Sequence, residues 1–324
     1  MEKPAIEGGS PVRDQKIYYG HQYIDEADIQ AVVDVLRSDY LTCGPKIAEL
    51  EKKLCDLTGA KYAVVCSNGT AALHIACLAA GVGAGDEVIT TPITFAASAN
   101  CALYCGARPV FADINAETYN IDPASVEKCV TEKTKAVVAV DYTGQSVELD
   151  ELLQICHEKK LVLIEDGAHV IGTEYKGRKN GSIADMTMFS FHPVKTVTAG
   201  EGGAILTNSE EYYQKLLLYR AHGITRDERL LEHPSDGPWY YEQLVLGYNY
   251  RITDMQAALL ISQLDKLEMF SRRRKEIVAR YNEAFSKIPG IFVQKEIPES
   301  DTTRHLYILR IKPEEFSIDR RRFF

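Results

Sequence analysis

The sequence lacks an apolar run of about 18 residues, the length that a membrane-spanning helix needs. Its first residues, MEKPAIEGGSPVRDQ, also lack the apolar core of a signal peptide. Basic residues are in the minority, since 37 lysines and arginines stand against 46 aspartates and glutamates, and the net charge is −9. A surface for nucleic acid or anionic lipid needs the opposite excess. We therefore expect a cytoplasmic protein that binds neither nucleic acid nor membranes, although this charge is compatible with a local pocket for a phosphorylated small molecule.

Motifs that hold metal ions are missing as well. The sequence has no CxxC pair and no HExxH, and its eight cysteines are scattered through the first half, mostly in apolar segments. Cys101 and Cys105 lie four residues apart on a predicted helix, a spacing that suits a pair of metal ligands, but no His-Cys cluster accompanies them. We interpret the cysteines as small buried side chains in a reducing compartment, and we expect no metal.

What the sequence does contain is a regular alternation of short apolar runs and amphipathic segments. The runs 63–68, 86–91, 108–114, 135–142 and 161–167 predict strands, and the segments between them predict helices of 9 to 13 residues. This order implies βαβ units and a mostly parallel sheet that helices cover on both faces, which is an α/β fold. In such a sheet, ligand-binding side chains gather at the carboxyl ends of the strands.

The 324 residues exceed one typical domain, so we expect a large domain and a smaller one. An N-terminal segment and the large domain take residues 1–255, and a linking helix and a small C-terminal α/β domain take residues 256–324. A helical pattern over 254–288 bridges the two, and 304–312 predicts a strand of the small domain. Because one strand cannot bury a sheet face, we expect the small domain to be incomplete at its C-terminal end.

The turn after the first predicted strand reads SNGT (67–70) and opens a helix. Free backbone amides, a hydroxyl group and the positive end of a helix dipole at Asn68, Gly69 and Thr70 would make a phosphate site. The same residue types are typical of a plain helix N-cap. The sequence alone leaves both interpretations open.

Asp166 ends the strongly apolar strand 161–167. An acidic side chain in such surroundings needs a cationic or hydrogen-bonding partner. A protonated pyridine nitrogen, a lysine or a metal ion would each serve, and His169 could support or stack on such a ring. The alternative is a structural acid beside an ordinary core histidine.

Lys195 lies in SFHPVKTVTAGEGG, between a proline turn and a glycine-rich loop. A lysine that forms a Schiff base needs a fixed backbone and a partly dry pocket. Pro193 fixes a φ angle nearby, Ser190 supplies a hydroxyl on the other arm of the turn, and the glycines allow the backbone to approach a ligand. Two classes of protein fit: an enzyme that holds pyridoxal phosphate (PLP), and a nucleotide-binding α/β protein with the same phosphate site. The second class requires no particular lysine.

Five motifs occur in a characteristic order, namely NGTAAL, GDEVITTPITFAASAN, EDGAHVIG, SFHPVKTVTAGEGG and GYNYRITDMQAAL. They resemble the DegT/StrS-type nucleotide-sugar aminotransferases of PLP fold type I, the aspartate aminotransferase-like fold, and the resemblance covers essentially the whole chain. The segments YYGHQYIDEADIQAVVDVLRSDYLT, VDYTGQSVELD and DGPWYYEQLVLGYNYR are closest to the branch that acts in the pseudaminic acid pathway. Cys43 departs from the family pattern, which has glutamine at this position.

The resemblance implies a role for each matching residue. Lys195 would be the catalytic Schiff-base lysine, Asp166 would pair with the pyridine nitrogen of PLP, and Phe95 would stack on its ring. Asn249 matches a residue that reaches the cofactor phosphate from the neighbouring subunit, which implies a homodimer with shared active sites. The other implied cofactor contacts are Asn68, Gly69, Thr70, His169 and Ser190.

The reaction that the resemblance implies is transamination at C4 of a UDP-linked 4-keto-6-deoxy-N-acetylhexosamine, with L-glutamate as the amino donor, for a pseudaminic acid-type surface sugar. Contacts to the nucleotide sugar are implied for Tyr19, Asp39, Tyr40, Leu41 and Thr42. Two alternatives stay open: an aminotransferase for C3 or C4 of another nucleotide-linked keto-sugar, and a non-catalytic nucleotide-sugar sensor. The presence of Lys195 argues against the dehydratases of this family, in which a histidine replaces the lysine.

Overall fold

The centre of the computed structural model, which describes residues 3, 5–317 and 319–323, is a seven-stranded sheet. Its strand order is β1-β9-β8-β5-β4-β2-β3; β9 runs antiparallel to β1 and β8, and the other neighbours pair in parallel. The mostly parallel α/β sheet expected from the sequence is therefore confirmed. The strands are β1 (Tyr62–Cys66), β2 (Glu87–Thr90), β3 (Arg108–Phe111), β4 (Thr134–Val140), β5 (Val162–Asp166), β8 (Met186–Ser190) and β9 (Gly203–Thr207).

The helices begin and end where the local sequence favours it. Asn68, Ser209 and Thr253 cap α3, α7 and α8 with side-chain oxygens that accept an amide hydrogen bond. Gly59 ends α2 in the left-handed conformation. The α-helices are α1 (Glu26–Leu36), α2 (Pro45–Thr58), α3 (Gly69–Ala79), α4 (Ala97–Tyr104), α5 (Pro123–Cys129), α6 (Leu149–Lys159), α7 (Glu210–Arg220), α8 (Asp254–Leu264), α9 (Leu267–Phe285) and α10 (Arg320–Phe323), and short 3₁₀ helices cover Ala5–Glu7, Tyr142–Gly144 and Pro313–Glu315.

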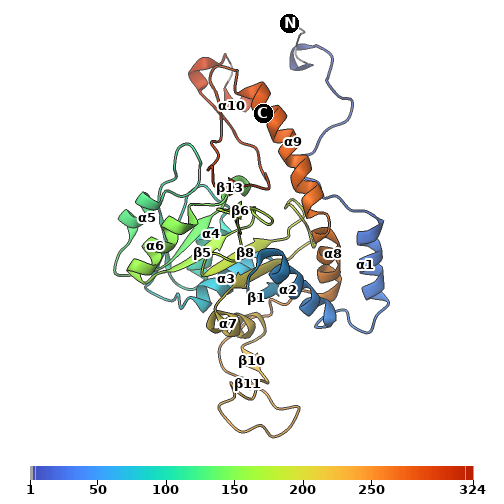
Figure 1. The fold of residues 1–324 in the computed structure, drawn as a ribbon, viewed down its shortest axis with the longest axis vertical. Coiled ribbons are helices and arrows are strands. Elements are labelled where there is room, and N and C mark those ends of the chain that lie inside the picture. The colour runs from blue at the N-terminus through green and yellow to red at the C-terminus, as the bar shows by residue number, and fades with distance from the viewer. Residues whose placement is uncertain (1–2, 4, 318, 324) are drawn as a thin grey trace.

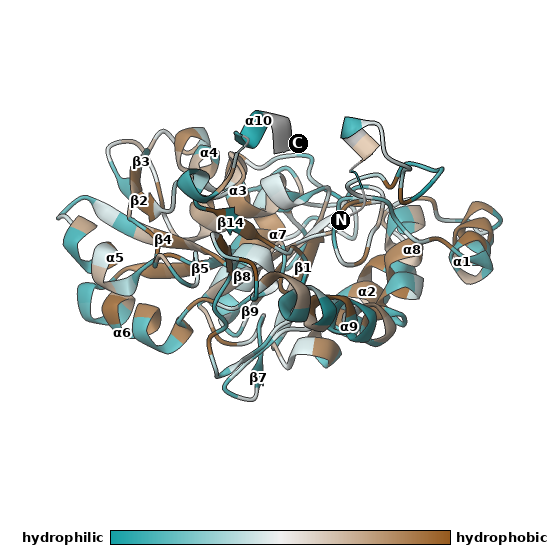
Figure 2. Ribbon diagram, turned by 90° about the horizontal axis from the view of Figure 1, so that it is seen from above, coloured by the Kyte–Doolittle hydropathy of each residue, from teal (hydrophilic) through white to brown (hydrophobic). Residues whose placement is uncertain are grey.

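Alternate side chains of the strands enter different cores, as a period of two requires. In β1, Val64 and Cys66 pack with α3, α4 and α7, whereas Ala63 and Val65 pack with α2 and α8. On the latter side of the sheet, α5 and α6 cover β2, β4 and β5. Figure 2 shows this layering, with hydrophobic residues concentrated on the strands and α3 and hydrophilic residues on the outer sides of the helices. The sheet is thus covered on both faces.

The helical pattern over 254–288 forms two helices in the structure, α8 and α9. Lys266 lies at the break between α8 and α9, and its ammonium nitrogen is 2.7 Å from carboxylate oxygens of both Asp25 and Asp28. These ion pairs tie the start of α1 to the junction of the two helices. In Figure 1, α9 rises from α8 away from the sheet. The helical pattern continues across the break, which is why the sequence did not reveal it.

The segment after α9 is only partly a separate unit. β12 (Ile291–Val293) pairs with β14 (Leu309–Ile311), whereas β13 (Ser300–Asp301) joins β6 (Glu174–Tyr175) and β7 (Arg178–Lys179). The strand predicted over 304–312 is therefore shorter than expected. Arg304 has a left-handed φ of 59°, and the Leu306 amide donates to the Thr143 carbonyl at 3.0 Å, so this stretch packs on the large sheet region. The division into residues 1–255 and 256–324 stays a prediction.

One segment projects from the rest of the molecule. β10 (Ile224–Thr225) and β11 (Glu242–Gln243) form the base of an arm at the bottom of Figure 1. Between these strands the arm contains DGPWYY, the first part of the segment DGPWYYEQLVLGYNYR. Within the described residues, no helix combines the length and the apolar character needed to span a membrane.

Candidate active site

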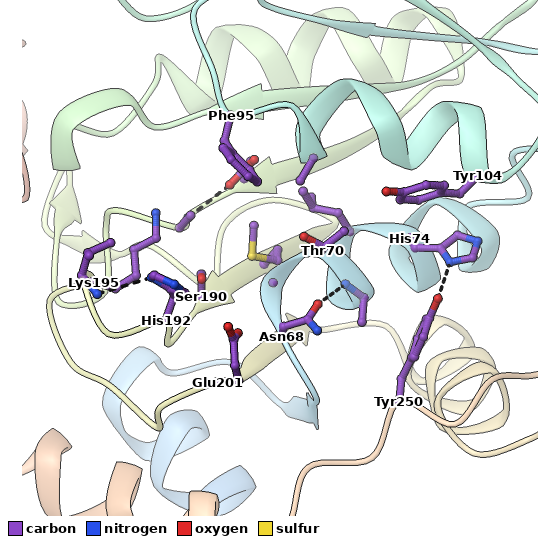
Figure 3. Close-up of a pocket in the computed structure, with 18 residues that line it drawn as sticks. Asn68, Thr70, His74, Phe95, Tyr104, Ser190, His192, Lys195, Glu201 and Tyr250 are labelled. Carbon is purple, nitrogen blue, oxygen red and sulfur yellow. Dashed lines mark hydrogen bonds between the residues drawn. The ribbon is translucent and has the colours of Figure 1, made fainter.

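A cavity of about 680 Å³ opens beside the carboxyl ends of β1, β5 and β8 and the start of α3. Figure 3 shows Lys195 and Phe95 extending into this space from different sides, with Thr70 at the start of α3 and Ser190 at the end of β8. The cavity brings together seven of the predicted site residues: Asn68, Gly69, Thr70, Phe95, Asp166, Ser190 and Lys195. Strand ends of one parallel sheet meet at one edge, so residues far apart in the sequence converge here.

The start of α3 has the geometry of an anion site. Asn68 has an extended backbone, and its Oδ1 accepts a hydrogen bond from the Ala71 amide at 2.8 Å. The amides of Gly69 and Thr70 lie in the first helical turn, where no intrahelical acceptor exists. A Cβ added to Gly69 would lie 3.0 Å from the Cβ of Ser190, so the serine hydroxyl is held against the helix start. Asn68 is therefore an N-cap, and this cap also leaves two amides and a hydroxyl for a phosphate group.

Asp166 presents a carboxylate to the same cavity although only 5% of the residue is exposed. The Ser98 hydroxyl donates to its Oδ2 at 2.6 Å, and the Ala168 amide donates to its Oδ1 at 3.3 Å. Burial raises the pKa of the Asp166 carboxyl, and the Ser98 hydrogen bond and the charge of Lys195 oppose this shift. A buried carboxylate of this kind is stabilised by a ligand that brings a positive N–H group.

Lys195 is held by a tight turn, in which its amide donates to the His192 carbonyl at 2.9 Å. Burial lowers the pKa of the Lys195 ammonium, and the charge of Asp166 acts in the opposite direction. The amine is therefore more easily deprotonated than that of a surface lysine, as a nucleophile or proton carrier requires.

The glycines after Lys195 have a different role from the close approach to a ligand that the sequence suggested. A Cβ on Gly203 would lie 2.4 Å from the Asn68 carbonyl oxygen, so this glycine lets β9 pack against the turn before α3. Gly200 has a left-handed φ of 76°, which a side chain would strain. These two glycines serve the packing and turning of the protein's own backbone.

Phe95 and His169 differ in their relation to the cavity. Phe95 is 76% exposed, so its ring is free to stack on a bound group. His169 does not line the cavity: its ring lies 4.4 Å from that of His305, and burial is the main reason that its pKa falls to about 2. His169 is thus a neutral buried histidine behind Lys195, and its Nδ1 has no hydrogen-bond partner among the described residues.

The other predicted residues lie outside the cavity of the single chain. Asn249 forms a β-bridge with Ala221, and Leu41 and Thr42 pack on the start of α8, where the Leu41 carbonyl accepts from the Asp254 amide. Tyr19 is 91% exposed. Its neighbour Gly20 packs on Val194, which lines the cavity. Asp39 and Tyr40 are exposed on the turn before α2.

Several residues that line the cavity were missed from the sequence. His74 lies one helical turn after Thr70, and its Nδ1 is 3.1 Å from the hydroxyl of Tyr250. The carbonyl of Tyr250 accepts a hydrogen bond from the Ser67 amide at 2.7 Å, which fixes GYNYR beside the phosphate turn. The helical spacing of His74 could have revealed it, whereas Tyr250 is brought in by a contact across more than half of the chain.

Comparison with known proteins gives a consistent result. A model of the DegT/DnrJ/EryC1/StrS aminotransferase family matches residues 22–323. The chain is 41% identical over 308 residues to the spore coat polysaccharide biosynthesis protein SpsC of Bacillus subtilis, covering 95% of this chain and 79% of SpsC. It is also 41% identical over 301 residues to a UDP-4-amino-4,6-dideoxy-N-acetyl-beta-L-altrosamine transaminase of Campylobacter jejuni, covering 92% of this chain and 77% of that protein.

Solved structures agree with this match. Spr1654 of Streptococcus pneumoniae has been assigned as a sugar aminotransferase and solved in PMP and PLP forms. It superposes with a TM-score of 0.85 at 35% identity, over 92% of this chain and 79% of its own. PseC of Helicobacter pylori, an aminotransferase involved in the biosynthesis of pseudoaminic acid, superposes with a TM-score of 0.85 at 34% identity, over 93% of this chain and 79% of its own.

Proposed function

The chain belongs to the DegT/DnrJ/EryC1/StrS aminotransferase family, and from this premise we propose that it transfers an amino group from L-glutamate to C4 of a UDP-linked 4-keto-6-deoxy-N-acetylhexosamine. The protein is a sugar aminotransferase of the PLP-dependent α/β fold, and PLP is its cofactor. The sequence-based predictions of family, fold class, enzyme class and cofactor are confirmed. The sugar, the donor and the residue roles below are proposals.

The residues of the cavity fit PLP. The amides of Gly69 and Thr70 and the hydroxyl of Ser190 would hold its phosphate. Asp166 would accept a hydrogen bond from the ring nitrogen, and Phe95 would cover the ring. When bound, PLP supplies an electron sink that stabilises negative charge on a substrate carbon. The buried Asp166 carboxylate strengthens this effect, because a nearby negative charge favours the protonated ring nitrogen.

Lys195 is the proton carrier in this proposal. Its pKa is lowered by burial, so a neutral amine is accessible, and the turn at His192 fixes its position. The amine takes a proton from the Cα of the amino donor and delivers one to C4 of the sugar in the second half of the reaction. An arginine could not replace it, since a guanidinium stays charged at any working pH.

The observation that carries the proposal is the position of Lys195 and Asp166 in one cavity with the phosphate site of α3. The choice of sugar is supported by the similarity to the Campylobacter jejuni transaminase and to PseC. SpsC is equally similar, which keeps transfer to another nucleotide-linked keto-sugar as the second candidate.

The test starts from purified protein loaded with PLP. We expect a near-visible absorption band that borohydride converts into a stable adduct, which peptide mapping locates on Lys195. Lys195→Ala should remove the adduct, whereas Lys215→Ala, a change in an exposed ion pair with Glu211, should not. L-glutamate should then shift the band, and the 4-keto sugar should restore it with an amine at C4, identified by NMR. A protein adduct that survives Lys195→Ala would refute the catalytic assignment, and a band that no amino donor shifts would favour a sensor.

A further inference from the structure

A second cavity, of about 70 Å³, lies on the other side of Lys195. We call it the rear cavity; Lys195, Thr196, Gln263, Phe270 and Arg274 contribute to its walls. Lys195 borders both this cavity and the active-site cavity. A group bound in the rear cavity would therefore lie next to the lysine that we propose as the proton carrier.

Arg274 reaches the rear cavity from α9, and it forms no ion pair with any acidic residue that the structure describes. Its Nη1 is buried and has no hydrogen-bond partner in the part of the chain that the structure describes. Burial alone accounts for the lowered pKa of the guanidinium, and no carboxylate contributes. The guanidinium carbon lies 6.0 Å from the centroid of the Phe270 ring. The neighbouring Arg273 differs, because it is exposed and pairs with Glu276 at 2.8 Å.

Three other polar atoms close to Lys195 also lack partners among the described residues. They are the hydroxyl of Thr196, a residue of the rear-cavity wall, and the Nδ1 atoms of His169 and His305. Burial, together with the charges of Lys195 and Arg274, lowers the pKa of His305 to about 3, so this ring is neutral and close to both cations. Buried polar groups without partners are costly, and two of them, on Arg274 and Thr196, belong to residues that line the rear cavity. This indicates that a ligand supplies the missing acceptor.

We propose that the rear cavity binds the α-carboxylate of the amino donor, with Arg274 as its main partner and the Thr196 hydroxyl as a second donor. A guanidinium and a carboxylate form a bidentate pair, which would satisfy the Nη1 of Arg274. The α-carboxylate is bonded to the carbon from which Lys195 takes the proton. Because Lys195 lines both cavities, a carboxylate in the rear cavity would lie beside the same side chain that carries the proton. This inference rests on the proposed function.

The diphosphate of the nucleotide sugar is another negatively charged group that could bind in the rear cavity. The size of the cavity favours the carboxylate of the amino donor over this diphosphate. A single carboxylate matches one guanidinium in a space of about 70 Å³, whereas a diphosphate carries more charge and more atoms. The two sources act in different halves of the reaction, so they can be separated by experiment.

The test compares Arg274→Gln with Arg273→Gln, its exposed neighbour on the same helix, in PLP-loaded protein. Stopped-flow absorbance measures the reaction with L-glutamate and, separately, the reaction of the aminated protein with the 4-keto sugar. We expect Arg274→Gln to raise the glutamate concentration at half-maximal rate by about 100-fold, the size of effect seen when one partner of a buried charge pair is removed. The sugar reaction should change by less than about twofold. Calorimetric titration with 2-oxoglutarate should show the same loss of affinity without turnover, and Arg273→Gln should match the wild type in every measurement.

A selective loss in the sugar reaction would overturn the proposal in favour of the diphosphate, and equal effects or no effect on the two halves would also overturn it. If Arg274→Gln fails to fold or to bind PLP, Arg274→Lys keeps the charge but not the bidentate geometry and should still weaken glutamate selectively. Failure of the wild type to react with glutamate would instead count against the proposed function, and the calorimetric comparison would still decide whether Arg274 binds a carboxylate.

Discussion

Three buried carboxyl groups lie at the ends of β4 and β5, and each has different partners. Asp166 faces the active-site cavity, whereas Glu165 accepts hydrogen bonds from Asn180 at 2.5 Å and Thr187 at 2.6 Å. Asp141 accepts one bond from the Val147 amide at 2.7 Å, its Oδ2 has no assigned hydrogen-bond partner among the described residues, and the Glu165 carboxyl lies beside it. Burial and the charge of Glu165 raise the pKa of Asp141 well above its ordinary value. We infer that Asp141 stays protonated and donates to Glu165, which reduces the negative charge behind the active site.

Replacing Asp141 with asparagine tests this inference at the scale of one residue. In the folded wild type Asp141 keeps its proton, while in the unfolded chain it ionises near its ordinary pKa. Stability should therefore fall as pH rises from that value towards the raised folded pKa, by up to about 1.4 kcal/mol per pH unit. The asparagine amide would keep the hydrogen bonds without this penalty, so Asp141→Asn should gain stability relative to the wild type from pH 5 to pH 8. Urea unfolding at both pH values measures the gain.

The control for this experiment is Asp141→Ala, which removes the hydrogen bonds at every pH. It should be less stable than Asp141→Asn by about 1–3 kcal/mol at both pH 5 and pH 8, because neither alanine nor asparagine ionises. A stability difference between Asp141→Asn and the wild type that does not change with pH would show that Asp141 is ionised in the folded protein.

The two site residues that the sequence indicated most directly, Lys195 and Asp166, each stand out from the local sequence pattern. Lys195 and Asp166 could be placed near one another because strand ends of a parallel sheet meet at one edge and because each interrupts an apolar pattern. Arg274 could not be placed, since it lies among several arginines on one amphipathic helix and only the packing of α9 on the rear of the lysine turn distinguishes it. Tyr250 is similar, because its position depends on a contact with Ser67 far away in the sequence.

At the scale of elements, the start of α3 combines a cap, an anion site and a close approach to β8. The cap uses Asn68, which the sequence predicted, and the close approach is possible because Gly69 has no side chain.

Two other elements differ from what the local sequence pattern indicated. The break between α8 and α9 coincides with ion pairs to α1, and the shortened strand β14 results from contacts with the Thr143 region. Neither partner is near in sequence, so periodicity could not indicate either change.

Gly69→Ala should weaken cofactor binding more than it affects folding. The added methyl group would lie 3.0 Å from the Cβ of Ser190 and would push the hydroxyl away from the helix start. Loss of one hydrogen bond to a charged phosphate corresponds to about 1.5 kcal/mol, or about tenfold in the dissociation constant of PLP. Alanine also favours the helix, which limits the loss of stability. Spectrophotometric titration with PLP and thermal unfolding of the cofactor-free protein measure the two effects.

Gly83→Ala is the matched control, since a Cβ at this position meets no atom within 4 Å. It should leave the affinity for PLP unchanged. If Gly69→Ala also leaves the affinity unchanged while the protein stays folded, the start of α3 does not hold the phosphate.

At the scale of the whole molecule, some residues of the expected site lie outside the cavity of the single chain. Asn249 and the turn 39–42 do not reach the cavity, although Tyr250 lines it. Phe95 and Tyr104 line the cavity and expose large parts of their rings, and Leu246 is exposed near the base of the arm. A second copy of the chain would cover such a surface and could bring Asn249 to the neighbouring cavity, as the family resemblance implies. The position of Asn249 relative to the cavity of a second copy follows neither from a sequence pattern nor from the structure of one chain.

Mixed dimers test whether the active site is shared between subunits. Lys195→Ala and Asn249→Ala should each abolish or strongly reduce transamination in a homodimer. If Asn249 acts in the neighbouring site, a dimer that combines one copy of each variant has one site with both changes and one site with neither. Random exchange between equal amounts of the variants makes half of the dimers mixed, so about one quarter of the wild-type activity should return. If Asn249 acts in the site of its own chain, each site of the mixed dimer keeps one defect and no activity returns. Light scattering shows whether the protein is a dimer, and differently tagged variants allow the mixed species to be purified and assayed directly.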